Sequence, residues 1–385
     1  MSAMDAPVAN SDTDAALKRR IDAARDATLT WLDSVAFAGG PKGVMRISHA
    51  HDADAWPGVL LPGTYNGILC RELIDGLDRL DGEDRATLVA WFEAFRTEDG
   101  RFRMTGMHDT AVFKKPDRDE TWRYIDFHVT NYSLAAIEAL NPDRIPNLIF
   151  ARPWLDPIYL KAWLADRDLR DPWQEGNNIV NLASFLAGIE RTGDAADQRA
   201  AAATFPILFD WHDRLQEPTT GFWGVGQSEP DRRLEAVAGA VHNYHLWYSR
   251  RRPIPYHERA IDYALTWNPA VFSACIDVDM VDLLAHAALL TDYRRSDIET
   301  WLHRMVGALL DAQNPDGGFC DEREGVRRQD GWVGGYEEPH GISNTFATWF
   351  RWIAIAMAAD VLWPGWRHWR FRRSMGIGYR LGGVT

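Results

Sequence analysis

Apolar residues recur at spacings of three and four along almost the whole 385-residue chain, which is the periodicity of α-helices. The strict alternation of apolar and polar residues that is typical of half-buried strands is almost absent. The sequence therefore predicts an all-α protein. We expect twelve helices, over residues 15–35, 65–80, 83–95, 131–140, 157–166, 176–191, 195–215, 234–249, 256–265, 278–290, 296–312 and 343–362.

The expected helices alternate between two kinds. Those at 83–95 and 296–312 carry many charges, as expected of helices with one wet face, whereas those at 176–191 and 278–290 are apolar nearly all round. A helix that is apolar on every face has to be buried on every face. The alternation predicts an (α/α)6 toroid, a double ring of six helix pairs with the apolar helices inside. A solenoid of helix pairs is the alternative, but it leaves more of the inner faces exposed.

Three loops that lead from an outer helix to the next inner helix share one turn pattern. Their sequences are EDGRF at 98–102, TGFWG at 220–224 and QNPDGGF at 313–319. Each has a glycine where a tight turn needs a positive φ, followed by an aromatic residue that can plug the end of the ring. Their common place in the helix-pair cycle favours an internal repeat over three unrelated turns.

The segment QNPDGGF at 313–319 resembles the Q-x-x-D-G-G-F/W repeat of the terpenoid cyclase and protein prenyltransferase α/α-toroid superfamily. GISNTFATW at 341–349 resembles the helix start that follows the repeat in that superfamily. The resemblance implies the fold. It departs at the functional positions, because Met280 replaces the last acid of a D-x-D-D motif at 277–280, and QDGW at 329–332 lacks the zinc-binding cysteine of prenyltransferases.

Charge and cysteine content narrow the possible partners and the compartment. The net charge is −13 with both signs interspersed, and the basic stretches are the short runs at 250–252 and 366–373, so nucleic acid is not an expected partner. The three cysteines are odd in number and far apart, which favours a reducing compartment without disulfides. No segment reaches the ~20 apolar residues of a membrane span. We expect a cytoplasmic protein without a transmembrane segment.

The chain is expected to hold one folded domain. Residues 1–14 are polar, acidic and unlike a secretory signal, and we expect a disordered lead there. The toroid domain is expected over 15–365, followed by a C-terminal tail over 366–385. The sequence does not determine the oligomeric state.

Polar residues recur at the starts of the otherwise apolar helices. In a toroid these starts converge on one mouth, where free N–H groups favour anionic or hydroxyl-rich ligands. Helix capping accounts for Asp277, but it does not account for the histidines or for acids inside a buried helix. The catalytic candidates are Asp279 and Glu338 as acid and base, with His128, His340 and Asp277 beside them. The substrate-binding candidates are Asp126, Asn131, Glu175, Asn178, His242, His245, Asn344, Trp122, Trp223 and Trp332.

This residue set favours an enzyme acting on a glycan or a similarly polar small molecule. Asn, His and carboxylates suit sugar hydroxyls, and tryptophans in the flanking loops suit stacking on sugar faces. By analogy of fold, a hydrolase, lyase or epimerase is expected, although fold alone does not confer function. A terpenoid cyclase-like or prenyl-transfer enzyme and a non-catalytic binding toroid are the alternatives. No cofactor is expected, and a divalent metal stays open, since no ligand spacing stands out beyond His242 and His245.

Overall fold

A computed structural model describes residues 11–107, 121–226, 228–229, 232–322, 326–328 and 333–371. The described residues are mainly helical, with one small antiparallel sheet, which confirms the all-α class. The α-helices are α1 (Ser11–Ser34), α2 (Leu60–Leu73), α3 (Gly82–Glu93), α4 (Thr121–Leu140), α5 (Pro157–Ala165), α6 (Pro172–Thr192), α7 (Ala195–Leu215), α8 (Arg233–Arg250), α9 (His257–Ala264), α10 (Ala274–Leu290), α11 (Arg295–Asp311) and α12 (Thr345–Leu362). The short elements are η1 (Pro57–Val59), η2 (Leu77–Arg79), η3 (Ile149–Leu155), β1 (Val326–Arg328) and β2 (Glu337–Pro339).

Every expected helix is present, and the bounds differ most at α2 and α4. α4 begins ten residues earlier than expected, at Thr121 rather than at 131, because polar residues such as Asp126 on its inner side hide the apolar periodicity. α2 ends at Leu73 rather than at 80, where Asp75 adopts a positive φ of 59°. α1 begins at Ser11, inside the expected lead, and residues 1–10 lie outside the described residues.

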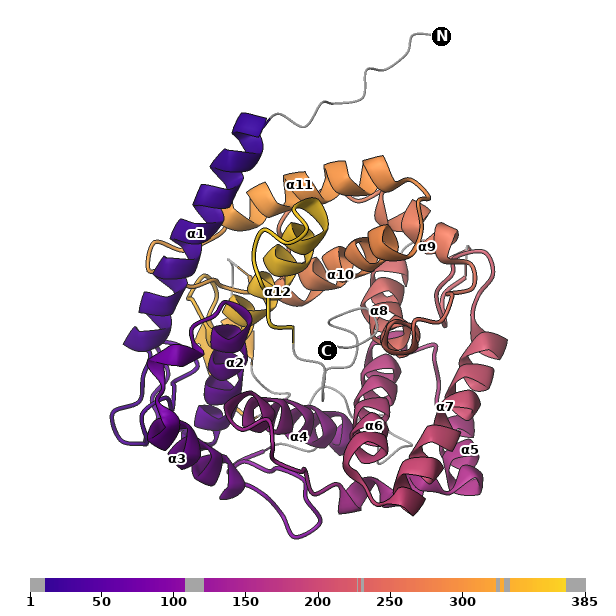
Figure 1. The fold of residues 1–385 in the computed structure, drawn as a ribbon, viewed down its shortest axis with the longest axis horizontal. Helices are drawn as coiled ribbons and strands as arrows, with labels where there is room; N and C mark the ends of the chain where they lie inside the picture. Colours follow the sequence, from indigo (N-terminus) through magenta and orange to yellow (C-terminus); the bar gives the residue numbers. More distant parts are fainter. Residues whose placement is uncertain are drawn as a thin grey trace.

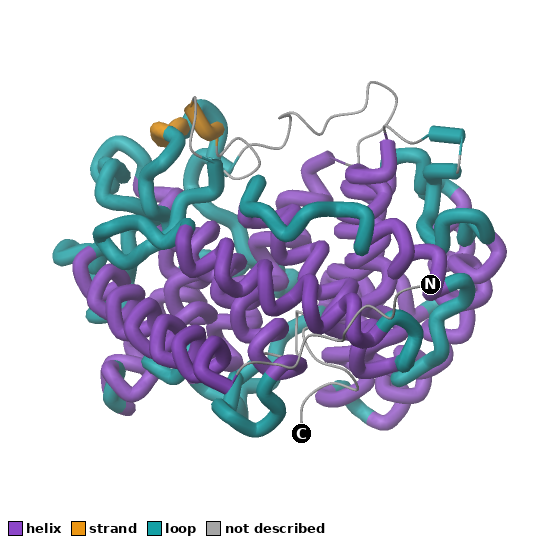
Figure 2. Tube along the Cα trace, turned by 90° about the horizontal axis from the view of Figure 1, so that it is seen from above, coloured by secondary structure: helices purple, strands orange, loops and turns teal. Residues whose placement is uncertain are grey.

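The even-numbered helices follow one another in space. α2 packs against α4, α4 against α6, α6 against α8, α8 against α10 and α10 against α12, and α12 then packs against α2. Figure 1 shows these helices around a common centre, with α1, α3, α5, α7, α9 and α11 on the outside. In the perpendicular view of Figure 2 the helices form one layer, with loops on both sides and the strands on one of them.

The even-numbered helices are as buried as their composition predicts. Every residue of α2 is buried, and so are nearly all residues of α12. Among the described helices, α12 alone is long and apolar enough to span a membrane, and 83% of it is buried inside the protein. Core helices share this composition, so the finding is no evidence of a membrane protein.

The expected turn repeat is present, and it is tied to the inner helices. Gly100, Gly221 and Gly317 have φ angles of 101°, 76° and 96°, and the aromatic residues that follow them, Phe102, Phe222 and Phe319, are fully buried. The Tyr244 hydroxyl of α8 donates to the carbonyl of Gly221. In the other two turns, and in the loop between α1 and α2, a backbone N–H donates to a threonine hydroxyl of the next inner helix. The pairs are Met45 to Thr64, Phe102 to Thr130 and Phe319 to Thr348, each at 3.0 Å.

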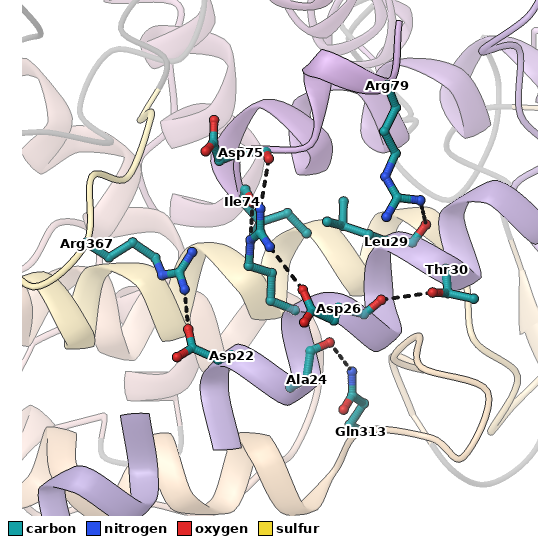
Figure 3. A network of polar contacts seen from close by, with 11 residues as sticks. Asp22, Ala24, Asp26, Leu29, Thr30, Ile74, Asp75, Arg79, Gln313 and Arg367 are labelled. Atoms are coloured by element: carbon teal, nitrogen blue, oxygen red, sulfur yellow. Dashed lines mark hydrogen bonds and ion pairs between the residues drawn. The ribbon is translucent and has the colours of Figure 1, made fainter. Parts of the chain in front are cut away.

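Helix α1 bonds both to the end of α2 and to two segments late in the sequence, as Figure 3 shows. Gln313 Nε2 donates to the carbonyl of Ala24 at 2.9 Å, and Arg367 pairs with Asp22. Arg25 Nε donates to the carbonyl of Ile74 at 2.6 Å at the end of α2. The part of the expected tail that is described, 366–371, therefore packs on the domain, and 372–385 lie outside the described residues.

Gly176 of α6 and Gly239 of α8 allow these two helices to approach at backbone distance. A Cβ atom on Gly239 of α8 would lie 2.2 Å from the carbonyl carbon of Pro172, at the start of α6. We expect Gly239→Ala to lower the free energy of unfolding by about 1–3 kcal/mol, since a rigid backbone has to move. Urea unfolding measures the effect. Gly307→Ala is the matched control, because nothing lies within 4 Å of its Cβ position on α11, and it should be neutral or stabilising. Equal effects of the two substitutions would contradict the prediction.

Candidate functional site

A polar cavity lies between the inner helices. Residues of α4, α6, α8, α10 and α12 line it, and its volume is about 40 Å³, which is room for a few water molecules. The lining consists of Asn131, Tyr132, Asn177, Val180, Asn181, Ser184, Val241, His242, His245, Val278, Asp279, Asp282 and Phe350. Four of the sequence-predicted residues, Asn131, His242, His245 and Asp279, meet here although they come from three different helices.

Asp279 is a buried acid without a partner. Its exposed fraction is 4%, and it forms no hydrogen bond or ion pair with any described residue. Burial raises the pKa of this carboxyl well above its usual value, and the neighbouring charges of Asp282 and Asp277 raise it further. Asp279 therefore retains its proton at a pH where ordinary carboxyls are ionised, and it can donate that proton inside the cavity.

His242 is a base that stays unprotonated, in contrast to Asp279, which keeps its proton. Its Nδ1 lies 2.7 Å from the carbonyl oxygen of Ala238, and because a carbonyl only accepts, we assign the ring hydrogen to Nδ1. Burial, together with the neighbouring His245, lowers the pKa of His242 to about 4. The ring is therefore neutral near pH 7, and Nε2 keeps a lone pair that can accept a proton. The cavity thus holds a protonated acid and an unprotonated base.

Asp282 supplies the negative charge beside Asp279. Its oxygens lie 3.2 Å from His245 Nε2 and 3.2 Å from His286 Nδ1. Burial would raise the pKa of Asp282, but the two histidines outweigh burial and hold it below its usual value. Two carboxyls one helical turn apart therefore have pKa values shifted in opposite directions, which is the pattern of acid–base sites.

Asparagines from α4 and α6 form the other wall. Asn131 Nδ2 donates to Asn181 Oδ1 at 2.5 Å, and Asn181 Nδ2 lies 3.2 Å from His128 Nδ1. His128 is therefore behind this wall rather than in the lining. Asn181 was not among the sequence-predicted residues, although its spacing of four from Asn177 in an apolar helix was a usable signal.

Asp277 lies away from the cavity. Its side chain pairs with the buried guanidinium of Arg351 and accepts a hydrogen bond from the Phe272 N–H at 3.0 Å. Burial raises the pKa of Asp277, and Arg351 opposes that rise. This arrangement makes Asp277 part of the packing between α10 and α12.

Glu338, His340 and Asn344 form a separate polar group near the start of α12. Asn344 caps that helix through the Ala347 N–H and donates to Glu338 Oε1 at 2.9 Å, and Tyr336 donates to Glu338 Oε2 at 3.3 Å. His340 Nδ1 lies 3.6 Å from Glu322. None of these residues lines the cavity that holds Asp279, so the expected pairing of Asp279 with Glu338 is not seen.

The remaining candidates have structural partners or lie in the core. Asp126 pairs with Arg101 at 2.7 Å, and burial raises its pKa to about 6 against the effect of that arginine. Glu175 pairs with Arg167 at 3.3 Å. Asn178 is buried with an unpartnered Oδ1. Trp223 is fully buried and donates to the carbonyl of His212 at 3.0 Å, so it offers no stacking surface. The side chain of Trp122 and all of Trp332 lie outside the described residues.

Within the described residues, no group of three or more His, Cys, Asp or Glu side chains is arranged to hold a metal ion. No protein-family model, no curated protein and no solved structure matches the chain.

His212 provides a test of the buried histidines. Its exposed fraction is 0%, and burial lowers its pKa to about 4. The unfolded chain protonates this residue below about pH 6.5 while the folded chain does not, so its contribution to stability is lost as the pH falls toward 4. We expect the stability advantage of the wild type over His212→Gln to shrink by up to about 3 kcal/mol between pH 6.5 and pH 4. Urea unfolding of both proteins across this range measures it, and a constant difference would contradict it.

Proposed function

We propose that the chain is an acid–base enzyme that acts on a carbohydrate or similarly polar substrate in the cavity, with Asp279 as proton donor and His242 as proton acceptor. One observation carries the proposal, namely a buried carboxyl without any hydrogen bond in a cavity that also contains a neutral imidazole. An unsatisfied buried carboxyl costs stability, and such groups concentrate at functional sites.

We also propose that the twelve helices form an (α/α)6 toroid. The closed series of contacts from α2 through α12 and back to α2 supports it, as does the burial of the even-numbered helices. In this arrangement the cavity lies near the axis of the ring. The QNPDGGF turn is a scaffold feature, because Gln313 and Gly317 bond to each other and to α1.

The lining favours a polar substrate over a hydrocarbon. Amide groups of Asn131, Asn177 and Asn181 face the cavity together with imidazole and carboxyl groups. A hydrocarbon would leave the unsatisfied Asn131 Oδ1 and Asp279 Oδ2 without partners, at a cost of about 1–3 kcal/mol each. Hydroxyl groups of a sugar can donate to the lining groups and accept from them. A sugar ring is larger than the cavity, so its entry requires side chains such as Tyr132 and Phe350 to move.

The chemistry follows from the protonation states. In a hydrolysis, Asp279 gives its proton to the leaving oxygen as the bond to it breaks, and a water molecule that attacks the other side loses a proton to His242. In an elimination, His242 takes the proton from carbon and Asp279 protonates the leaving oxygen. Asp282 remains ionised throughout and keeps its contact with His245 Nε2 at 3.2 Å.

A substrate panel tests the proposal. The full chain is incubated with 4-nitrophenyl glycosides, with oligosaccharides ending in an unsaturated uronic acid, and with squalene and geranylgeranyl diphosphate. We expect turnover of a sugar and none of the isoprenoids. Turnover of an isoprenoid alone would replace the proposal with a cyclase-like function, and sugar binding without turnover would replace it with a binding function.

A further inference from the structure

A second pocket lies outside the inner ring. It is formed by the loop between α7 and α8, the start of α8 and one face of α9, and its volume is about 210 Å³. Thr219, Thr220, Arg233, Arg259, Asp262 and Tyr263 are among its lining residues. It shares no residue with the cavity around Asp279.

Two arginine side chains in this pocket have no acidic partner among the described residues. The guanidinium groups of Arg233 and Arg259 form no ion pair or hydrogen bond with any described residue, although the chain has a net charge of −13. The Nε atom of Arg233 is buried and unsatisfied. Its guanidinium lies 5.2 Å from the centre of the Tyr263 ring, a cation–π contact that holds it in place. This buried Nε–H can therefore donate to an anion bound in the pocket.

The acid in this lining does not supply that anion. Asp262 Oδ1 accepts from Arg294 Nη1 at 3.1 Å and from the Tyr293 hydroxyl at 3.0 Å. The hydroxyls of Thr219 and Thr220 already donate to Glu217 and to the Val225 carbonyl. The guanidinium groups are therefore the side-chain donors left for a ligand, and the pocket has an excess of positive charge.

The start of α8 adds to this excess. The helix begins at Arg233 without a side-chain cap, so the N–H groups of its first turn lack side-chain acceptors. Glu235 in the same turn is exposed, and its Oε2 lies 3.4 Å from Arg232 Nε, so its negative charge is already paired outside the pocket.

We propose that this pocket binds a dianionic oxyanion, the phosphate or sulfate group of a small ligand. Two guanidinium groups match two negative charges, and each can donate two parallel hydrogen bonds to such a group. The volume exceeds that of the ion, which leaves space for the part of the ligand attached to it. The pocket is independent of the reaction proposed for Asp279.

Calorimetric titration with sodium phosphate, sodium sulfate and sodium acetate at constant ionic strength tests the proposal, because salt screens such contacts. We expect phosphate or sulfate to bind at least about tenfold more tightly than acetate. Arg233→Gln and Arg259→Gln should each weaken that binding by roughly tenfold to a hundredfold, the loss expected for a charged hydrogen bond. Arg233→Lys keeps the charge and loses the buried Nε donor, so it should weaken binding less than Arg233→Gln.

Arg199→Gln is the matched control, an exposed arginine on α7 outside the pocket, and it should leave the affinity unchanged. Circular dichroism checks that each variant is folded. Arg259 lies on the exposed side of α9, so Arg259→Gln tests the site without altering the start of α8. The proposal would be overturned if neither phosphate nor sulfate bound, or if acetate bound as tightly as they do. It would also be overturned if the wild type and both glutamine variants bound phosphate and sulfate with equal affinity.

Discussion

Asp279→Asn is expected to lower turnover of the substrate at least about a hundredfold and to raise the free energy of unfolding by about 1–3 kcal/mol at pH 7. The carboxyl is the proposed proton donor, and an amide of the same shape cannot replace it. The same carboxyl is buried without a partner next to the negative charge of Asp282. Its removal therefore relieves a cost to stability. Initial rates and urea unfolding measure the two effects.

The gain in stability should depend on pH with a definite sign. The folded-state pKa of Asp279 is raised, so below about pH 4 the carboxyl is protonated in both folded and unfolded chains and costs little. Above that pH the unfolded chain loses the proton first, and the wild type becomes less stable relative to Asp279→Asn. The advantage of the variant should grow from pH 4 upward.

Asp277→Asn is the matched control on the same helix. Asp277 neutralises Arg351, so the same chemical change should destabilise the protein there. A loss of stability in Asp279→Asn at neutral pH, or unchanged turnover, would contradict the assignment of Asp279 as a functional acid. Unchanged turnover together with unchanged sugar binding would favour a structural role for the whole cavity.

Arg351→Met is expected to lower the free energy of unfolding by about 3–5 kcal/mol. The exposed fraction of the Arg351 side chain is 1%, and its guanidinium pairs with Asp277 while donating to the carbonyls of Cys320 at 3.1 Å and Asp321 at 2.9 Å. Its loss leaves the buried carboxylate of Asp277 without its positive partner and removes a donor from each of the two carbonyls. Urea unfolding measures the change.

The double variant Arg351→Met/Asp277→Asn separates the ion pair from packing. Replacing the Asp277 carboxylate as well should raise the free energy of unfolding by at least about 1 kcal/mol relative to Arg351→Met alone. Arg20→Met is the control, because its pair with Asp311 is exposed and should contribute less than about 1 kcal/mol. Strict additivity of the two buried substitutions would contradict a direct interaction between these residues.

The helices were predictable because their signal is local. Spacing of apolar residues located every helix, and the glycines of the repeated turn have the positive φ that their positions predicted. The start of α4 was missed, since inward-facing Asp126 and His128 interrupt the apolar pattern. These buried polar residues stand at positions where helical periodicity predicts apolar ones.

The roles of the acids were less predictable because they depend on distant partners. Asp277 and Asp279 are two residues apart, so they point to different sides of α10. Arg351 lies 74 positions from Asp277 in the sequence, so the sequence does not show that it neutralises Asp277. Nor does the sequence show that Asp279 has no partner among the described residues. Glu338 was expected to form an acid–base pair with Asp279, yet it bonds to Tyr336 and Asn344 outside the cavity.

The seam between the first and last helices has a consequence for synthesis on the ribosome. The Trp352 indole of α12 donates to the Thr28 hydroxyl of α1 at 2.9 Å across 324 positions of sequence, and α12 covers one side of α2. Contacts this distant in sequence form late, because closing so long a loop is entropically costly. The apolar surface of α2 therefore lacks this neighbour until α12 has been translated. The nascent protein should be most prone to aggregation, and most dependent on chaperones, before α12 emerges.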